Sequence, residues 1–205
     1  MTEGVAKIQP REVLEFWFGR AHDEADVLRT HAPLWFRKSA ELDAEITTRF
    51  GAAVEAASQG GLSEWEDTAQ GVLARIILVD QFRRNIHRNS AAAFAADALA
   101  RAWAVDGIER GLDRQLRPVE RTFFYLPLEH AEDRALQARC VQLFEALRDS
   151  VPEPLREIFE GYLAYARAHR DVIERFGRFP HRNALLARPS SPEEIAFLAE
   201  PGSSF

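Results

Sequence analysis

The chain has 205 residues, of which 46% are hydrophobic and 28% charged, a composition typical of a folded globular protein with a sizeable core. Its formal net charge of -6 disfavours nucleic-acid binding, which depends on neutralising many phosphates. No apolar run approaches the roughly 20 residues of a membrane span, and the first ten residues lack the apolar core of a signal peptide, so we expect a cytoplasmic protein that does not enter membranes. Cys140 is the only cysteine, which excludes a disulfide within the chain and disfavours a zinc cluster.

Apolar residues recur every three or four positions along the chain, and no alternating strand pattern is found, which predicts an all-α protein. Capping residues, prolines and glycines set the expected helix ends: Pro10 suits a first turn, Gly19 suits an end, and Ser39 and Ser90 suit N-caps. The polar stretch at residues 20–33 is predicted to be mostly loop. The predicted helices cover residues 10–18, 39–60, 68–82, 90–107, 118–127, 131–148 and 154–176, followed by a short helix from residue 191.

Three of these helices have further distinguishing features. Residues 68–82 contain the run VLARIILV and are apolar almost all round, as expected of a central buried helix. The helix that begins at Pro118 is expected to break near Pro127, which cannot donate to the helical ladder. SPEE at residues 191–194 has the pattern of a capping box. We therefore predict a single domain of seven to eight helices, packed as antiparallel pairs that could stack as a superhelix.

Several stretches spread over nearly the whole chain resemble the bacterial domain-of-unknown-function family 924. They are VLEFWFG (13–19), LARIILVDQFRRNIHRN (73–89), FFYLPLEHAED (123–133), HRDVIERFGRFPHRN (169–183) and SPEEIAFL (191–198). The resemblance implies a bacterial protein with a helical fold similar to tetratricopeptide repeats, and it implies no activity. The chain departs from the family's usual Pro, Tyr, Gly and Gly at Arg83, His87, Asn89 and Ala187 respectively.

Two segments of similar sequence, DQFRRNIHRN at residues 80–89 and ERFGRFPHRN at residues 174–183, provide the first candidate site. A planar guanidinium binds carboxylate or phosphate with two parallel hydrogen bonds, so two such segments facing each other would form an anion site. The alternative is structural, since arginines near helix C-termini hydrogen-bond the last carbonyls. The candidate ligand-binding residues are Asp80, Gln81, Arg84, Asn85, Arg88, Arg178, Arg182 and Asn183.

The stretch PLEHAED at residues 127–133 provides the second candidate site. Neighbouring carboxyl groups and an imidazole are suited to acid–base work, so Glu129 and His130 are candidate catalytic residues, with His181 as a third and Glu132 as a ligand-binding residue. These acidic residues could instead form the first turn of the next helix, or His130 could bind a metal together with His169 and His181. His169, on the apolar stripe of its helix, is either a core residue or a ligand-binding one.

Three hypotheses follow from these candidates. The first is a pocket between helices for a small carboxylate or phosphate, in which arginines orient the ligand while His130 and Glu129 move a proton; whether it catalyses a reaction is left open. The second is a tetratricopeptide-like module that binds a peptide or protein without catalysis. The third is a structural ion-pair network. The first requires Arg84 and Arg178 to share one hollow. No motif indicates a cofactor or a metal, and a homodimer is one partner that the sequence allows.

Overall fold

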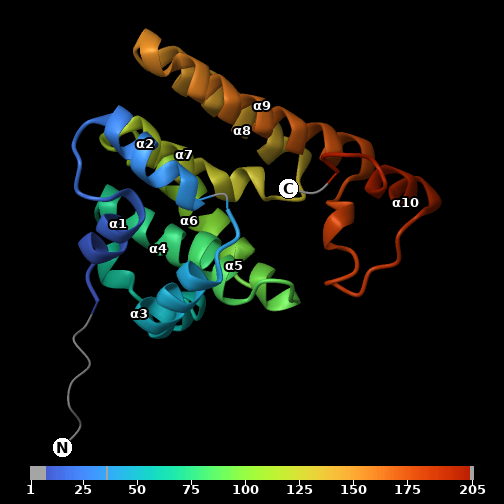
Figure 1. The fold of residues 1–205 in the computed structure, drawn as a ribbon, viewed down its shortest axis with the longest axis horizontal. Coiled ribbons are helices and arrows are strands. Elements are labelled where there is room, and N and C mark those ends of the chain that lie inside the picture. The colour runs from blue at the N-terminus through green and yellow to red at the C-terminus, as the bar shows by residue number, and fades with distance from the viewer. Residues whose placement is uncertain (1–7, 36, 204–205) are drawn as a thin grey trace, which may run out of the picture.

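The computed structural model describes residues 8–35 and 37–203, and these contain helices, turns and loops without a strand (Figure 1). The α-helices are α1 (Pro10–Phe18), α2 (Glu24–Trp35), α3 (Ala40–Ser58), α4 (Ala69–Ile76), α5 (Arg83–Ile86), α6 (Asp97–Glu109), α7 (Pro118–Glu129), α8 (Arg134–Ser150), α9 (Glu153–Phe176) and α10 (Pro192–Leu198). The π-helix η2 (Ile77–Phe82) joins α4 to α5 in one continuous rod. The described residues therefore form nine separate helical rods, where seven or eight were predicted.

Most of the predicted helix ends follow from local chemistry and are confirmed. The exception is Ser90, whose side chain makes no capping hydrogen bond, because a short 3-10 turn follows it and α6 begins only at Asp97. The Ser39 hydroxyl accepts a hydrogen bond from the amide of Leu42 at 3.2 Å, which caps α3. Ser191 and Glu194 form the predicted capping box of α10, in which each side chain accepts from the other's backbone amide. Gly177 ends α9 in the left-handed conformation, with φ of 70°.

Two further predictions of local structure are wrong. Most of the stretch predicted as loop, residues 20–33, belongs to α2, whose first turn is stabilised by a hydrogen bond from the Asp26 amide to Asp23 Oδ1. Burial of Val27 and other apolar side chains favours the helix despite its many polar residues. The second is the expected break at Pro127, because α7 continues to Glu129. Residues 122–129 are all buried, and their packing offsets the hydrogen bond that Pro127 cannot make.

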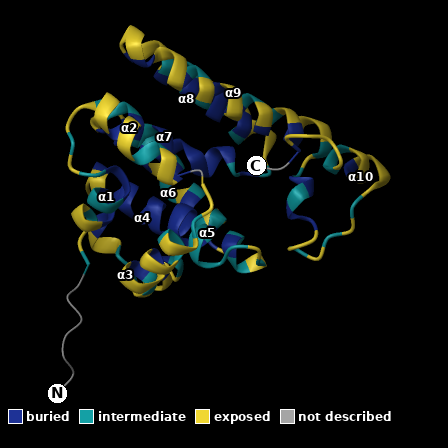
Figure 2. Ribbon diagram, viewed as in Figure 1, coloured by how far each residue is buried: buried dark blue, intermediate teal, exposed yellow. Residues whose placement is uncertain are grey.

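The rod formed by α4, η2 and α5 runs through the middle of the bundle and packs against α1, α3, α6 and α7, as predicted for a central buried helix. Figure 2 shows α4 as a dark blue, buried helix surrounded by helices that expose one face, while residues 84–86 at the α5 end of the rod are of intermediate burial. Aromatic rings fill the space around the rod: Trp17 lies 5.3 Å from Phe82 and 5.8 Å from Phe123, in edge-to-face geometry. This packing fixes the position of η2 and of the polar residues that it carries.

Helices α8 and α9 form an antiparallel pair that lies over α7. Arg148 pairs with Glu160 near the turn between the two helices, and Arg134 pairs with Glu174 at 3.6 Å near the opposite end. The packing of helices as antiparallel pairs is therefore observed here, while the tetratricopeptide-like superhelix stays a prediction. None of the described helices is long and apolar enough to cross a membrane.

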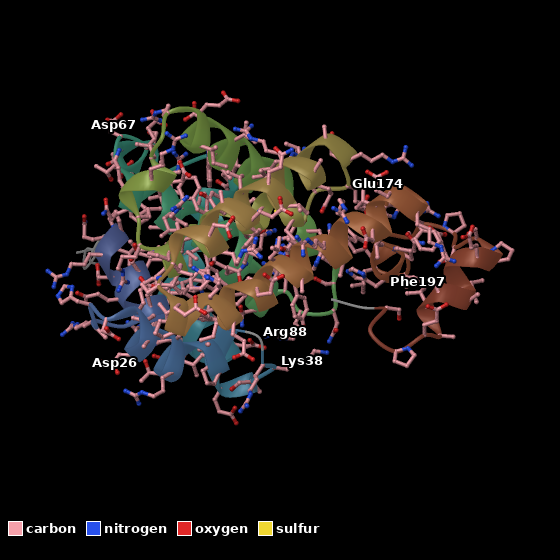
Figure 3. The ribbon with its side chains drawn as sticks, turned by 90° about the horizontal axis from the view of Figure 1, so that it is seen from above. Asp26, Lys38, Asp67, Arg88, Glu174 and Phe197 are labelled. Carbon is pink, nitrogen blue, oxygen red and sulfur yellow. The ribbon has the colours of Figure 1, made fainter. Side chains whose placement is uncertain are left out.

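Residues 177–203, which include α10, form what we call the C-terminal segment. It packs on the end of α9 around a small hydrophobic cluster of its own, made by Val172, Ile173 and Phe179 with Phe176 and Phe197. This cluster is separate from the large core of the bundle. Figure 3 shows Phe197 at the opposite side of the molecule from Asp26 and Asp67. Two of the candidate residues, His169 and His181, contact Phe179 of this small cluster.

Candidate functional site

The side chain of Asp80 lies at the centre of the site and is fully buried. It belongs to the π-helix η2, and π-helical turns within α-helices occur frequently at functional sites. Three groups surround its carboxylate: His130 Nδ1 donates to Oδ1 at 2.8 Å, Gln81 Nε2 donates to Oδ2 at 2.6 Å, and Arg84 Nη2 lies 3.6 Å from Oδ1. The structure thus brings together four residues that the sequence assigned to two separate candidate sites.

Electrostatics give these groups defined charges at neutral pH. Burial by itself would raise the pKa of Asp80, but the electrostatic attraction of His130, the positive charge of Arg84 and the hydrogen bonds from His130 and Gln81 hold that pKa below its usual range. Burial lowers the pKa of His130, and the neighbouring Arg84 and Arg182 lower it further against the attraction of Asp80. The imidazole is therefore neutral and donates Nδ1–H to an ionised carboxylate, which leaves Nε2 as a lone-pair base.

The pKa of Glu129, at the end of α7, is shifted in the opposite direction to that of Asp80. It is 5% exposed, and burial together with the negative charge of Asp80 raises its pKa to about 8. His169 Nδ1 lies 3.5 Å from Glu129 Oε1 and donates to the carbonyl of Tyr165 at 2.9 Å. Burial lowers the pKa of His169 to about 3, so both partners of this contact are neutral. Acid–base catalysis uses a protonated group together with an ionised one, and Glu129 and Asp80 form such a pair.

The sequence did not indicate Gln137 of α8, which positions Glu129 and His130. Its side chain is completely buried and donates from Nε2 to the carbonyls of Glu129 at 2.6 Å and Ala131 at 2.8 Å. These are carbonyls at the C-terminal end of α7, which has no further turn to satisfy them. Gln137 could not be found from the sequence, because it reads as an ordinary polar residue of an amphipathic helix.

Asp97 is the second residue that sequence reasoning missed. It begins α6 and accepts two hydrogen bonds from Arg84, from Nη1 to Oδ1 at 2.8 Å and from Nη2 to Oδ2 at 3.1 Å. Arg182 approaches the same carboxylate from the C-terminal segment, with Nη1 3.4 Å from Oδ2, and donates to the carbonyl of His130 at 3.1 Å. The two similar segments therefore do meet, through Arg84 and Arg182 and a shared carboxylate.

Other predicted residues lie outside this cluster. Asn85 and Arg88 both bind Asp43 of α3, Asn85 through one hydrogen bond of 2.8 Å and Arg88 through two of 2.7 Å. Arg178 binds Glu194 of α10 with bonds of 2.6 and 2.8 Å. The hollow that Arg84 and Arg178 were expected to share is not observed, because each guanidinium pairs with a different acidic residue. Arg178 instead fastens α10 to the end of α9, which is the structural alternative.

Glu132 and Asn183 lie between the cluster and the C-terminal segment. Arg188 donates to both Glu132 carboxylate oxygens, at 2.6 and 2.9 Å, and to Asn183 Oδ1 at 3.0 Å. The amide of Phe179 also donates to Glu132, at 2.8 Å. The ring of Phe179 lies between two histidines, 5.5 Å from His169 and 5.6 Å from His181, measured between ring centroids. Glu132 therefore anchors the segment that carries His181.

Burial is also the main cause of the pKa shifts of two further candidate residues, His181 and Arg182. It lowers the pKa of His181 to about 4, with a further contribution from the charge of Arg182. It lowers the pKa of Arg182 to about 10, with a further contribution from Arg84. Arg182 is thus a buried cation that its acidic neighbours compensate only in part.

Cavities and metal ligands give two further findings. Two surface cavities of about 280 and 470 Å³ lie away from the cluster. The first is lined by residues of α1, α2 and α3, and the second by residues at the end of α3 and around the start of α6. Neither includes a predicted site residue. Within residues 8–35 and 37–203, no group of three or more His, Cys, Asp or Glu side chains could hold a metal ion.

The fold and the cluster define an all-α protein with buried acid–base groups. The family model described as "Bacterial protein of unknown function (DUF924)" matches residues 13–202, so the chain belongs to this family, as its motifs indicated. A solved structure of a protein of unknown function from Agrobacterium tumefaciens is 38% identical over 92% of this chain and 96% of that chain, with a TM-score of 0.78. Comparison with curated proteins gives no match.

Proposed function

We propose that the cluster around His130 binds a small anionic molecule and exchanges a proton with it. The observation that carries this proposal is the hydrogen bond of 2.8 Å between His130 Nδ1 and the fully buried, ionised Asp80. A carboxylate that orients a neutral imidazole through Nδ1 leaves Nε2 available as a general base and stabilises the imidazolium that forms.

The surrounding charges support an anionic ligand. Two guanidinium groups, those of Arg84 and Arg182, act on the imidazole electrostatically, and both contact the carboxylate of Asp97. A negatively charged ligand would neutralise the part of the Arg182 charge that its acidic neighbours do not. The site is shielded from water, so Coulomb attraction is strong there.

The protonation states of His130, Asp80 and Glu129 give each of these residues a different role. His130 accepts a proton at Nε2, and Asp80 holds the ring in the tautomer that makes this possible. Glu129 is protonated at neutral pH and is the group able to give a proton back. Gln137 fixes the backbone of Glu129, so the acid and the base keep their relative positions.

The test is a thermal-shift screen of small carboxylates and phosphates on wild type, His130→Gln and, as a control, the exposed His22→Gln. We expect a compound that raises the melting temperature of wild type and of His22→Gln, and that shifts the His130 imidazole signals in NMR spectra. His130→Gln should lose at least a tenfold factor in affinity, about 1.4 kcal/mol. Each compound that binds is then incubated in D2O and followed by proton NMR for exchange or conversion.

The structural network is the competing explanation, and the same screen distinguishes it. If no compound stabilises wild type while Arg84→Ala and Arg182→Ala strongly lower the melting temperature, these charges only hold the fold together. The proposal of a ligand site would then be wrong.

An interaction module of tetratricopeptide-like architecture remains a second candidate. The observation in its favour is the outer face of α9, where the side chains of Tyr165 and Ile158 are 62% and 41% exposed. Exposed apolar residues on one helix face are typical of a surface that binds a peptide or a second copy of the chain. Sedimentation of wild type and of the double variant Ile158→Ser/Tyr165→Ser tests the homodimer: a dimer that dissociates in the variant supports it, and a wild-type monomer contradicts it.

A further inference from the structure

The guanidinium of Arg182 uses only part of its hydrogen-bonding capacity. Nη1 donates to the carbonyl of His130 and lies near Asp97, but Nε is buried and has no partner among the described residues. No hydrogen bond of Nη2 is found there either. The residue is 6% exposed, so few water molecules can take the place of the missing partners. An unpaired buried donor destabilises the folded state, which calls for an explanation.

The surroundings of Arg182 leave one edge of the guanidinium for a ligand. Its Cζ lies over two aromatic rings, 4.9 Å from the centroid of Phe94 and 4.5 Å from that of Phe179. The two rings contact the guanidinium, and Nη1 already donates a hydrogen bond. The edge formed by Nε and Nη2 is therefore the part of the guanidinium that is left for a ligand. Two parallel N–H groups on such an edge match the two oxygens of a carboxylate.

Arg84 shows this recognition within the same cluster, since it holds the carboxylate of Asp97 with two hydrogen bonds of 2.8 and 3.1 Å. Arg182 reaches that carboxylate only through one longer contact of 3.4 Å. Two guanidinium groups therefore share one carboxylate, and the second lacks a planar partner of its own. Arg75 also has an unpartnered buried Nε, but its guanidinium pairs with Glu66 and stacks on Trp103.

We propose that the free edge of Arg182 binds the carboxylate of the ligand, so that this site takes a small carboxylic acid in preference to a phosphate. The inference rests on the proposed function and narrows it, because it names the chemical class of the anion. The carboxylate would lie beside the His130 imidazole and would give Arg182 the pairing that Arg84 has with Asp97.

Access to this edge requires the C-terminal segment to move, because Nε is covered. Two features allow this movement. The segment has a small hydrophobic cluster separate from the main core, and beside the ring contact of Phe179 with His169 it makes polar contacts with Glu132, Asp97 and the carbonyl of His130. Water can replace the partners in these polar contacts when the segment moves. The ligand carboxylate then stabilises the closed arrangement.

The experiment follows the Arg Nε–H signals of the 15N-labelled protein during titrations at constant ionic strength and pH 6.5. The probes are sodium acetate and sodium succinate on one side, and sodium phosphate and sodium sulfate on the other. The Arg182 signal is assigned by its loss in Arg182→Lys, or by triple-resonance spectra of wild type if that variant does not fold. Arg175→Lys is the matched control, since Arg175 also lies over two phenylalanines, Phe176 and Phe197, but pairs with Glu193.

We expect the carboxylates to shift the Arg182 Nε–H signal and to bind at least tenfold more tightly than phosphate or sulfate. Arg182→Lys keeps the charge but loses the planar edge, so it should lose that preference, whereas Arg175→Lys should retain it. Equal or tighter binding of phosphate, or carboxylate binding that leaves the Arg182 signal unmoved, overturns the inference and leaves the proposed anion site standing. If no anion changes either the Arg182 or the His130 signals, both proposals are wrong.

Discussion

Asp80 and Glu129 are two carboxyl groups in one cluster whose pKa values are shifted in opposite directions. Asp80 has a guanidinium and two hydrogen-bond donors within reach, whereas the only contact of the Glu129 carboxyl found among the described residues is His169 at 3.5 Å. The partners of each residue, more than its depth, decide its charge, because both are almost completely buried.

Replacing Asp80 by Asn tests how strongly the cluster depends on this charge. The variant removes a buried anion and leaves Arg84 and His130 without it, so we expect a loss of about 3 kcal/mol in the free energy of unfolding. Urea denaturation measures the loss. The control Asp26→Asn removes an exposed partner of Arg29 and should change stability by less than about 0.5 kcal/mol. A loss in Asp80→Asn as small as in the control would contradict the assigned ionisation.

Two departures of this chain from its family lie at positions where the backbone adopts a conformation that favours glycine. The resemblance implies glycine at positions 89 and 187, and Asn89 and Ala187 adopt φ of 61° and 52°. Asn tolerates this left-handed region better than Ala does, because its side chain can hydrogen-bond locally. We expect Ala187→Gly to raise the free energy of unfolding by about 1 kcal/mol, measured by urea denaturation. The control Ala102→Gly, on the exposed face of α6, should lower it by about 1 kcal/mol.

At the scale of elements, the ends of helices were predictable and their interruptions were not. Ser39, Gly177 and Ser191 act through hydrogen bonds to near neighbours in sequence, so their roles can be read directly from it. The π-helix η2 could not be predicted, because residues 71–82 are buried on every side and hydrophobic periodicity gives no register there. The break expected at Pro127 failed because tertiary packing outweighs one lost hydrogen bond.

The end of α7 gives an element-scale prediction. Gln137→Leu keeps the size of the side chain but leaves the carbonyls of Glu129 and Ala131 without their donor, so we expect a loss of about 2 kcal/mol. It should also weaken any ligand that binds at His130, because the end of the helix would shift. The exposed Gln59 of the loop after α3 is the control, and Gln59→Leu should stay within about 0.5 kcal/mol of wild type. Equal effects in the two variants would contradict a positioning role for Gln137.

For the whole molecule, stability should depend on pH in a way that identifies Glu129. Its pKa rises from an ordinary value of 4.5 to about 8 on folding, so the folded state holds more protons than the unfolded state between these values. Stability contributed by this group is complete below about pH 4.5 and is lost as the pH rises to 8. His169, His181 and His130 act in the opposite direction, because burial lowers the pKa of each, to about 3 for His169 and about 4 for His181, so that stability falls as the pH drops through 6.5.

The histidine contributions are largest below pH 6.5 and continue to a smaller extent above it, so Glu129 is measured above pH 6.5 as the difference between wild type and Glu129→Gln. From pH 6.5 to 8 we expect wild type to lose about 1.5 kcal/mol relative to this variant, determined by urea denaturation at steps of half a pH unit. Glu129→Gln keeps the histidine contributions but cannot titrate at position 129, so its stability should not fall in this range. A fall of the same size in both proteins would assign the effect to another group.

The assembly of the site is also a property of the whole molecule, and the sequence revealed only part of it. Asp80, Arg84 and His130 were recognised as candidates from their chemical types, and their meeting depends on packing between the central rod and α7. Asp97 was not recognised, since an acidic residue at the start of a helix is usually a capping group. Its partner Arg182 is 85 residues away in sequence, and no pattern of neighbouring residues indicates a contact between positions so far apart.

The separation of the two hydrophobic clusters has a mechanical consequence. A force applied at the C-terminus would be borne first by Phe197 and by the ion pairs of Arg178 and Arg188, before it reached the aromatic core around Trp17. In an optical trap, the chain should thus lengthen in two steps, a short one at low force and a long one at high force. Added salt should weaken the first step alone, and the first rupture would carry Arg182 away from His130 while the rest of the bundle still held.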